Sequence, residues 1–273
     1  MICRDAAIRI EARLSRLLAP PASPLVRFVV DGEPVGYVTP DRAQRLAQFA
    51  AMRRRDDALS LACAADERGQ AMTEIAAQLA REGALTAWRD ERYAVSTRFD
   101  APALFELERA AARYFGIHTY AAHVNGLVRA QDGVLMWLAR RSATKAIDPG
   151  MLDNLVGGGI AAGATVEGTV VKESWEEAGI DAAVAAQALN SAELTVFRQQ
   201  PDGIQHETIY AHDLWLPRHW KPENRDGEAV DHRLASLADV TRTLLADDGP
   251  DVMTADASLV AYDCLTRVAR AAI

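Results

Sequence analysis

The amino-acid sequence predicts an α+β protein in which a smaller mixed domain precedes a larger one. Strand-like runs rich in β-branched residues alternate with segments of helical periodicity along the whole chain. At 273 residues the chain is long enough for one large domain or two modest ones. The pattern changes near Gly116, where longer paired strands follow the shorter elements. We therefore expect an N-terminal α+β domain over residues 1–115 and a second domain over residues 116–273.

The composition is that of a soluble globular protein. Apolar residues make up 49% of the chain and charged residues 25%, and the formal net charge is −8. This balance does not favour a nucleic-acid binder, which would carry a basic excess. An acidic protein that handles phosphates needs local cations or a metal ion to offset its own field. No apolar run approaches the ~20 residues that cross a membrane, so we expect neither a nucleic-acid nor a membrane partner.

The three cysteines, Cys3, Cys63 and Cys264, are far apart and form no CxxC pair. They support neither a disulfide framework nor a zinc site, so a reducing, cytoplasmic compartment fits best. The arginine-rich start of the chain could also belong to a transit peptide. Because it contains Asp5 and Glu11 and places apolar residues at helical spacing, we expect a folded amphipathic helix there.

The first part of the chain is expected to contain short helices and strands. The segments VRFVV, DGEP and VGYV follow the first helix and predict a hairpin with an Asp-Gly turn. Residues 41–48 and 57–81 are expected to be helical, and residues 85–97 to be rich in strand. Residues 101–117 are expected to return to helix, because their leucines and alanines share one face. None of these segments contains a chemical motif.

Longer elements are expected in the second part. Residues 123–142 predict two strands about a turn at Gln131-Asp132-Gly133. A final helix is expected over residues 253–270, with Thr254 or Asp256 as its N-cap. The segments between them are a polar loop (143–154), a hairpin (192–200 with 204–217), and a loop, strand and helix (224–245).

One predicted helix, within GGGIAAGATVEGTVVKESWEEAGI (residues 157–180), carries three glutamates near its end. At about 100° per residue, Glu173, Glu176 and Glu177 lie within about 100° of arc. Like charges at this spacing repel, and the negative end of the helix dipole adds to the cost. A hard divalent cation such as Mg²⁺ or Mn²⁺ reverses that penalty, because it prefers oxygen ligands; the alternative is a solvated acidic face. The opposite, apolar side is formed by Val171, Trp175 and Ala178.

This stretch resembles the Nudix box, whose pattern is G-x5-E-x7-R-E-U-x-E-E-x-G-U. The spacing matches without a gap over 23 positions. With the central glutamate at Glu173, the first glycine is Gly158, the glutamate pair is Glu176 and Glu177, and the last glycine is Gly179. The resemblance implies the Nudix fold, a mixed β-sheet sandwiched between helices. It also implies metal-dependent hydrolysis of diphosphates linked to a further group.

Three positions depart from the box, one of them Ser174 in place of an aliphatic residue, and further motifs indicate a subfamily. The first glutamate of the box falls on Ala164, and its arginine falls on Lys172, which keeps the charge without the fork geometry. PGMLDN, GGG, KESWEEAG, Asp226-Gly227-Glu228 and MTADASLV resemble Nudix proteins related to the Nudix-like part of fungal thiamin pyrophosphokinase and its plant and bacterial relatives. This resemblance covers most of the chain and makes Ala164 a subfamily trait. It implies cleavage of diphosphates of thiamin-like compounds, including damaged analogues, to monophosphates.

The expected site residues fall into three groups. Glu173 and Glu177 are the first candidates for metal ligands, together with the backbone carbonyl of Gly158. Glu176 is a further ligand or the group that positions water, and Glu228 is a general base or distal ligand. The candidates for binding substrate phosphate, which could also be solvated surface cations, are Arg140, Arg141, Lys145 and Lys172.

The leading hypothesis is a Mg²⁺- or Mn²⁺-dependent enzyme that hydrolyses the phosphoanhydride bond of a small-molecule diphosphate. Thiamin diphosphate and its oxidised analogues are the candidate substrates. A homodimer is expected because members of the superfamily that the chain resembles are commonly dimers. One alternative, favoured by Ala164, is a ligand-binding module that keeps the fold without turnover; another is a hydrolase of nucleotide-type diphosphates. An isomerase resembling isopentenyl-diphosphate isomerase is less favoured, because Cys63 and Cys264 lie outside the segments expected to hold a catalytic cysteine.

Overall fold

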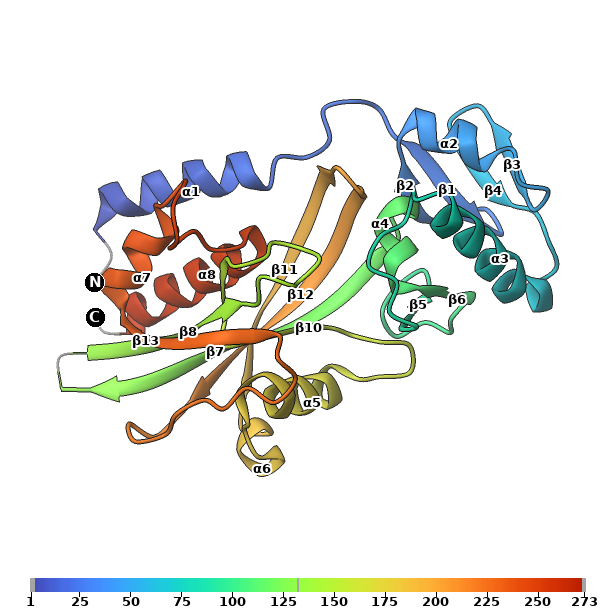
Figure 1. The fold of residues 1–273 in the computed structure, drawn as a ribbon. Helices are drawn as coiled ribbons and strands as arrows, with labels where there is room; N and C mark the ends of the chain where they lie inside the picture. Colours follow the sequence, from blue (N-terminus) through green and yellow to red (C-terminus); the bar gives the residue numbers. More distant parts are fainter. Residues whose placement is uncertain (1–2, 132, 272–273) are drawn as a thin grey trace.

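The computed structural model describes residues 3–131 and 133–271, and it contains helices and strands in two parts that lie side by side (Figure 1). The prediction of an α+β fold is confirmed. Of the expected turn, Asp132 lies outside the described residues; Gln131 follows one strand, and Gly133 is the first residue of the next, where it pairs with Ala130. All three cysteines are free.

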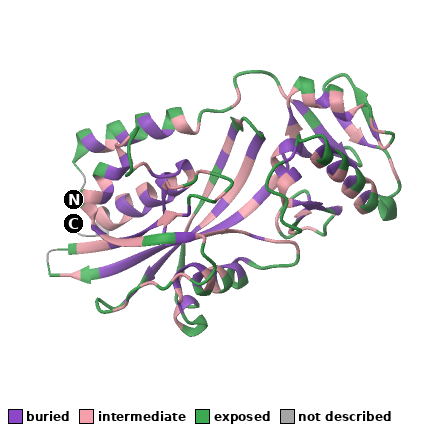
Figure 2. Ribbon diagram, in the orientation of Figure 1, coloured by how far each residue is buried: buried purple, intermediate pink, exposed green. Residues whose placement is uncertain are grey.

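A seven-stranded mixed sheet forms the centre of the larger part, with the order β11-β12-β7-β8-β13 and with β10 beside β7 and β9 beside β8. Strand β7 pairs in parallel with β12 on one side and antiparallel with β10 and β8 on the other. It is buried along most of its length (Figure 2), as expected of a strand covered on both faces. The strands are β7 (His118–Ala130), β8 (Gly133–Arg141), β9 (Leu152–Asp153), β10 (Val156–Gly159), β11 (Leu189–Gln200), β12 (Gly203–Trp215) and β13 (Ala229–Ser236).

Helices cover both faces of this sheet (Figure 1). On one face, Val170 of α5 shares a core with Val124 of β7. On the other face, Ile10 of α1 shares a core with Leu127 and Met136 of the sheet and with α7 and α8. Helix α1 therefore packs on the larger part, although the expected boundary groups it with residues 1–115. The helices are α1 (Arg4–Leu17), α5 (Val166–Ala178), α6 (Ala182–Ala185), α7 (Leu237–Leu244) and α8 (Ala255–Ala271).

The last helix begins as expected. Thr254 precedes α8, and its hydroxyl oxygen accepts a hydrogen bond from the backbone N–H of Ala257 at 3.2 Å, which is N-cap geometry. Asp256 instead pairs with Arg198 at 3.5 Å. Among the described helices, none is both long and apolar enough to cross a bilayer.

The smaller part has a separate core around a four-stranded sheet of order β2-β1-β4-β3 and a two-stranded sheet, β5-β6. Phe28 of β1, Leu59 of β4 and Leu79 of α3 are fully buried in that core. Its elements are β1 (Val26–Val30), β2 (Glu33–Val38), α2 (Pro40–Leu46), β3 (Met52–Arg55), β4 (Ala58–Leu61), η1 (Ala65–Glu67), α3 (Arg68–Arg81), β5 (Arg92–Val95), β6 (Phe105–Glu108), η2 (Arg109–Ala111) and α4 (Ala112–Phe115).

Two helices expected in this part were placed too broadly. The structure forms strand β4 at the start of the segment 57–81, where Ala58–Leu61 pairs with β1 and β3. It forms strand β6 within the segment 101–117, where Phe105–Glu108 pairs with β5. Both strands are four residues long, too short for periodicity to separate helix from strand, so their tertiary pairing decides.

The two parts meet at Gly116, which ends α4 with φ of +58°. A Cβ there would lie 1.8 Å from the carbonyl oxygen of Tyr37. The backbone N–H of Tyr37 donates to the Gly116 carbonyl at 3.1 Å, and Gly36 bridges to Ile117 just before β7. Only glycine combines this positive φ with so close an approach. Gly116 therefore allows the backbones of the small and the large sheet to come into contact, at a place that we call the seam.

Candidate metal and diphosphate site

Helix α5 has well-defined ends that set the direction of its glutamates. The Thr165 hydroxyl caps its start by accepting a hydrogen bond from the Gly168 N–H at 3.0 Å. Gly179 ends it in the left-handed conformation with φ of +67°, as the sequence predicts. The helix packs on β10 and β7, so one of its faces lies against the sheet.

The expected division of α5 into an acidic front and an apolar back holds only in part: Ala178 is buried and Val171 packs against the same core, as expected. The face against the sheet includes Val170, Ser174 and Glu177, all buried. Trp175, expected on the apolar back, is 43% exposed, and the Arg225 guanidinium lies 3.7 Å from the centre of its ring. A helical wheel gives the angles between side chains but not which angle faces the sheet; here a buried carboxylate occupies the packed face.

The glycines of β10 lie directly against the glutamates of α5. The backbone N–H of Gly157 donates a hydrogen bond to Oε2 of Glu177 at 2.8 Å. A Cβ on Gly158 would lie 2.4 Å from the carboxyl carbon of Glu173. Glycine at these positions therefore lets the strand backbone reach both carboxylates, which explains their place in the motif.

A loop folded onto the end of α5 brings two more carboxylates to Glu177. The backbone N–H groups of Glu223 and Arg225 donate to carbonyls of α5 at 3.0 and 2.8 Å. The Asp226 carboxylate accepts the N–H of Glu228 at 2.8 Å, which closes a tight turn. Oxygens of Glu177, Asp226 and Glu228 lie within 4.8 Å of one another. We call these three residues the carboxylate cluster.

Two basic side chains of the protein pair with the carboxylate cluster. The Lys145 ammonium hydrogen-bonds Oε2 of Glu228 and lies 3.9 Å from Oε1 of Glu177. Arg89, from the smaller part, donates to Oε1 of Glu228 at 3.0 Å. Although burial alone raises the pKa of Glu228, the hydrogen bonds and charges of Lys145 and Arg89 outweigh burial and hold it below its ordinary value. The cluster therefore favours a neighbouring positive charge, and here the side chains of Lys145 and Arg89 supply it.

Burial makes Glu177 the most perturbed carboxyl of the cluster. Loss of hydration raises its pKa to about 8, although Lys145 and the Gly157 N–H both favour the charged form. A buried carboxylate in this state is stabilised by a proton or by a nearby cation. The donors are all oxygens, which suits a hard divalent ion such as Mg²⁺ or Mn²⁺ better than a soft one. The residues present therefore fit the metal that the sequence predicts.

The other two expected glutamates lie beside the cluster. Among the described residues, the three-carboxylate cluster includes neither Glu173 nor Glu176. Both accept hydrogen bonds from the Lys172 ammonium, at 2.8 and 2.7 Å. Burial raises the pKa of Glu173, against the opposing effect of Lys172. Lys172 thus neutralises the exposed side of the glutamate triplet.

The four expected phosphate-binding cations lie in different places. Arg141 pairs with Asp153 at 2.7 Å and lines the same cavity as Lys145 and Lys172. Arg140 donates to the backbone carbonyls of Gly150 and Pro250, and it is absent from the cavity lining given by the described residues. The structure therefore brings three of the four to the site and places Arg140 in a loop contact.

The cavity has a volume of about 720 Å³ and lies between the two parts of the chain. Glu173, Glu176 and Glu228 line one side, and Arg89, Glu91, Tyr93 and Arg109 of the smaller part line the other. The Tyr93 hydroxyl packs on Gly159, where a Cβ would lie 2.0 Å from it. Sequence reasoning missed this second wall because its residues belong to no motif; it also missed Asp226 as a cluster member, although the Asp-Gly-Glu segment is the signal.

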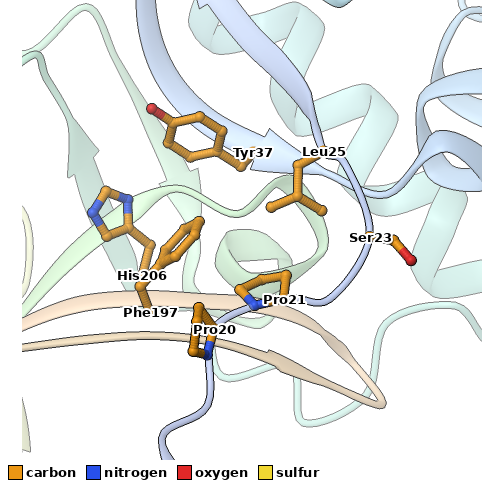
Figure 3. A pocket seen from close by; sticks show the side chains of 7 residues that line it. All are labelled: Pro20, Pro21, Ser23, Leu25, Tyr37, Phe197 and His206. Carbon is orange, nitrogen blue, oxygen red and sulfur yellow. The ribbon is translucent and has the colours of Figure 1, made fainter.

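A second cavity, of about 490 Å³, is of a different kind (Figure 3). It is lined by the prolines that follow α1 and by Tyr37, Phe197 and His206. Burial and the neighbouring His118 lower the pKa of His206 to about 4, so this imidazole is neutral. The described residues that line this cavity include no carboxylate, so it does not suit a divalent ion.

Comparison with known families assigns both parts of the chain. The NUDIX domain family matches residues 119–255, the part that contains the central sheet, α5 and the carboxylate cluster. The chain belongs to the Nudix family. A domain of unknown function, DUF4743, matches residues 14–119. The Nudix fold expected from the box, a mixed sheet between helices, is thereby confirmed, together with a domain that precedes it.

Similar proteins include other Nudix members. The chain is 36% identical over 202 residues to Nudix hydrolase 20, chloroplastic, of Arabidopsis thaliana, covering 74% of this chain and 53% of that protein. It is 33% identical over 196 residues to an uncharacterized protein of Saccharomyces cerevisiae, covering 66% and 57%. A solved structure from Deinococcus radiodurans aligns over 64% of this chain and 99% of its own, with 18% identity and a TM-score of 0.48. This Nudix chain thus spans about half the length of the two relatives.

Proposed function

We propose that this Nudix chain is a divalent-metal-dependent hydrolase that cleaves the phosphoanhydride bond of a small-molecule diphosphate. The observation that carries the proposal is the carboxylate cluster: Glu177 is buried, and Asp226 and Glu228 stand within 4.8 Å of it. Such a group is unstable as three free anions and is stabilised by a cation. Glu177 lies on the Nudix box helix, and Asp226 and Glu228 line a large cavity, which favours a catalytic ion over a structural one.

The proposed metal site consists of the cluster, with Glu173 and the Gly158 carbonyl as further ligands. A bound Mg²⁺ or Mn²⁺ supplies charge neutralisation at the diphosphate and a lowered pKa of the attacking water. Glu176 is 38% exposed and faces the cavity, where we propose that it positions that water. Glu228, held in its charged form by two cations, is better suited to be a ligand than a general base.

The proposed phosphate contacts are Lys145, Arg141 and Lys172. All three line the cavity beside the carboxylates, and each now pairs with at least one carboxylate. An incoming diphosphate offers these cations stronger, charge-assisted hydrogen bonds. Arg140, with its backbone partners, we assign to shaping the loop instead.

For the substrate, we propose thiamin diphosphate or its oxidised analogues, converted to the monophosphate. The support is the resemblance of PGMLDN, KESWEEAG and MTADASLV to the thiamin-pyrophosphokinase-associated group. The cavity extends from the carboxylates to the wall formed by the smaller part, which leaves room for an organic group beyond the phosphates. Nucleotide-type diphosphates are the alternative, and a direct assay distinguishes them.

The experiment is an assay of phosphate or monophosphate release from thiamin, nucleotide-sugar and dinucleotide diphosphates with Mg²⁺ or Mn²⁺. We expect metal-dependent turnover that EDTA abolishes, with thiamin-type diphosphates preferred. If the protein preferred a nucleotide-type diphosphate, the proposed substrate would be wrong, but the proposed metal-dependent hydrolysis would stand. Tight binding without turnover of any member would contradict the hydrolase and favour a binding module.

We further propose a homodimer acting in a reducing, cytoplasmic compartment. The three free cysteines support the reducing compartment. The homodimer is proposed because members of the Nudix superfamily are commonly dimers. Light scattering after size-exclusion chromatography tests the dimer, and a monomeric mass across micromolar concentrations would contradict it. Fractionation of the source cells tests the compartment.

A further inference from the structure

Arg89 crosses from the smaller part of the chain to the carboxylate cluster. Its Nη1 donates to Oε1 of Glu228 at 3.0 Å, while Lys145 bonds the other oxygen of the same carboxylate. Each oxygen of Glu228 is therefore paired with one cation of the chain. The Arg89 and Glu228 side chains are only 36% and 31% exposed, and both line the large cavity.

The backbone around Arg89 is held in an unusual conformation. Its N–H donates to Oε1 of the buried Glu108 at 3.1 Å. Ala87 and Asp90, on either side, have φ of +62° and +57°, in the left-handed region that non-glycine residues rarely adopt. Such conformations persist where the surroundings enforce them, and they gather at ligand-binding sites. The loop thus holds the backbone of Arg89 beside the cavity that this residue lines.

We propose that Arg89 is a substrate-binding residue. When a divalent ion occupies the carboxylate cluster, Arg89 leaves Glu228 and binds the substrate diphosphate; we call this change of partner the exchange. This inference rests on the proposed function. An ion bound to the carboxylate oxygens of Glu228 would occupy the partner of Arg89 and would repel the positive charge of its guanidinium. The released guanidinium then faces the cavity, and its planar fork matches two phosphate oxygens.

The neighbouring arginines of the same wall are not released in this way. Arg109 pairs with Glu91 at 2.6 Å, and Arg113 pairs with Asp202 at 3.3 Å. Neither of these partners belongs to the carboxylate cluster. Arg89 is therefore the arginine of this wall whose partner the metal ion takes. The N-terminal domain would thus supply a phosphate-binding residue that is free only in the metal-loaded protein.

The exchange predicts opposite effects of one substitution on two affinities. In Arg89→Gln, one competitor for Glu228 is lost, so the affinity of the substrate-free protein for Mn²⁺ should rise about threefold or more. With saturating Mg²⁺, the affinity for methylenediphosphonate should fall at least about tenfold, because a charged hydrogen-bond donor is lost. Isothermal titration calorimetry of the full chain measures both.

The matched control is Arg92→Gln, a nearby arginine of β5 that pairs with Glu106 at 3.8 Å outside the cluster. It should leave both affinities unchanged. Arg89→Lys keeps the charge without the fork; it should bind Mn²⁺ like the wild type and the analogue with intermediate affinity. Circular dichroism of each variant checks folding, and Arg89→Lys carries the test if Arg89→Gln does not fold.

The results separate this inference from the proposed function. A merely structural Arg89 would weaken both affinities when replaced, and that result would overturn the exchange. Wild-type affinities in Arg89→Gln would also overturn it, while leaving the metal site intact. If the wild-type protein bound neither Mn²⁺ nor the analogue, the proposed function and the exchange would both be wrong.

Discussion

The backbone N–H of Gly157 donates a hydrogen bond to the carboxylate of Glu177 over 2.8 Å, joining β10 to α5 across a partly buried interface. This contact orients Oε2 toward the strand, while Oε1 lies 3.9 Å from the Lys145 ammonium. The glycine strand and the glutamate helix therefore act as one unit. The position of the Glu177 carboxylate therefore follows from the packing of α5 on β10.

Replacing Glu177 should abolish turnover without unfolding the protein. Glu177→Gln keeps the volume and an oxygen that accepts the Gly157 N–H, but removes the charge that holds the ion. We expect kcat to fall by at least about 100-fold, more than the loss usual for outer partners of metal ligands. Product release with saturating Mg²⁺ measures it.

The control for that variant is Glu167→Gln, an exposed glutamate in the first turn of the same helix. It should leave kcat unchanged and cost a few tenths of a kcal/mol, roughly, through the helix dipole. Unchanged turnover in Glu177→Gln would show that this carboxylate does not hold the catalytic ion.

The stability of the metal-free protein should fall as pH rises. Burial raises the pKa of Glu177 from 4.5 to about 8 in the folded state. Between these values the folded protein binds more protons than the unfolded chain, so the free energy of unfolding decreases with increasing pH. The contribution is fully present below pH 4.5 and is lost as pH rises through about 8. Urea unfolding in EDTA between about pH 5 and 9 measures this trend.

Glu177→Gln provides the control for the pH dependence, since it removes the titrating group. Its free energy of unfolding should vary less with pH over the same range than that of the wild type. Equal slopes for the two proteins would mean that another group causes the dependence.

Gly158→Ala should displace Glu173. The added Cβ would lie 2.4 Å from the Glu173 carboxyl carbon, a distance that requires the side chain to move. We expect turnover to fall about tenfold or more, because small displacements of positioned groups are costly in catalysis. The control is Gly69→Ala in α3, where a Cβ meets nothing within 4 Å. It should keep activity and raise stability by about 0.5 kcal/mol.

Gly116→Ala should destabilise the seam between the two parts. Both Gly116 and Gly83 have positive φ, of +58° and +74°, but a Cβ on Gly83 meets nothing within 4 Å. Gly83→Ala should therefore cost about 1 kcal/mol, for the left-handed conformation alone. Gly116→Ala adds the collision with the Tyr37 carbonyl and should cost at least about 3 kcal/mol. Equal losses in thermal denaturation would contradict the close approach.

Local rules predicted the parts of the site that are close in sequence. The box spacing located Gly158, the glutamates and the Gly179 cap, because strand, turn and helix succeed one another within one short segment. The same rules did not show which face of α5 meets the sheet, so Trp175 was placed on the wrong side. They also could not separate short strands from helix at Ala58–Leu61 and Phe105–Glu108, where pairing with distant strands decides.

Asp226 and Arg89 also reach the site through tertiary contacts but were not predicted, although Glu228 and Lys145 were. Asp226 joins Glu177 because the loop after β12 hydrogen-bonds to the end of α5. Arg89 reaches Glu228 from 139 positions earlier in the chain, in a domain without a motif. Neither distance along the chain nor residue type predicts these contacts, because they depend on how the two parts pack.

Metal binding at the carboxylate cluster is tested directly by anomalous diffraction from crystals of the wild-type protein soaked in Mn²⁺. We expect an anomalous peak within bonding distance of the carboxylate oxygens of Glu177, Asp226 and Glu228, with the Lys145 ammonium moved away from Glu228. A fully soaked crystal with no peak at these oxygens, and with Lys145 still bound to Glu228, would contradict this expectation.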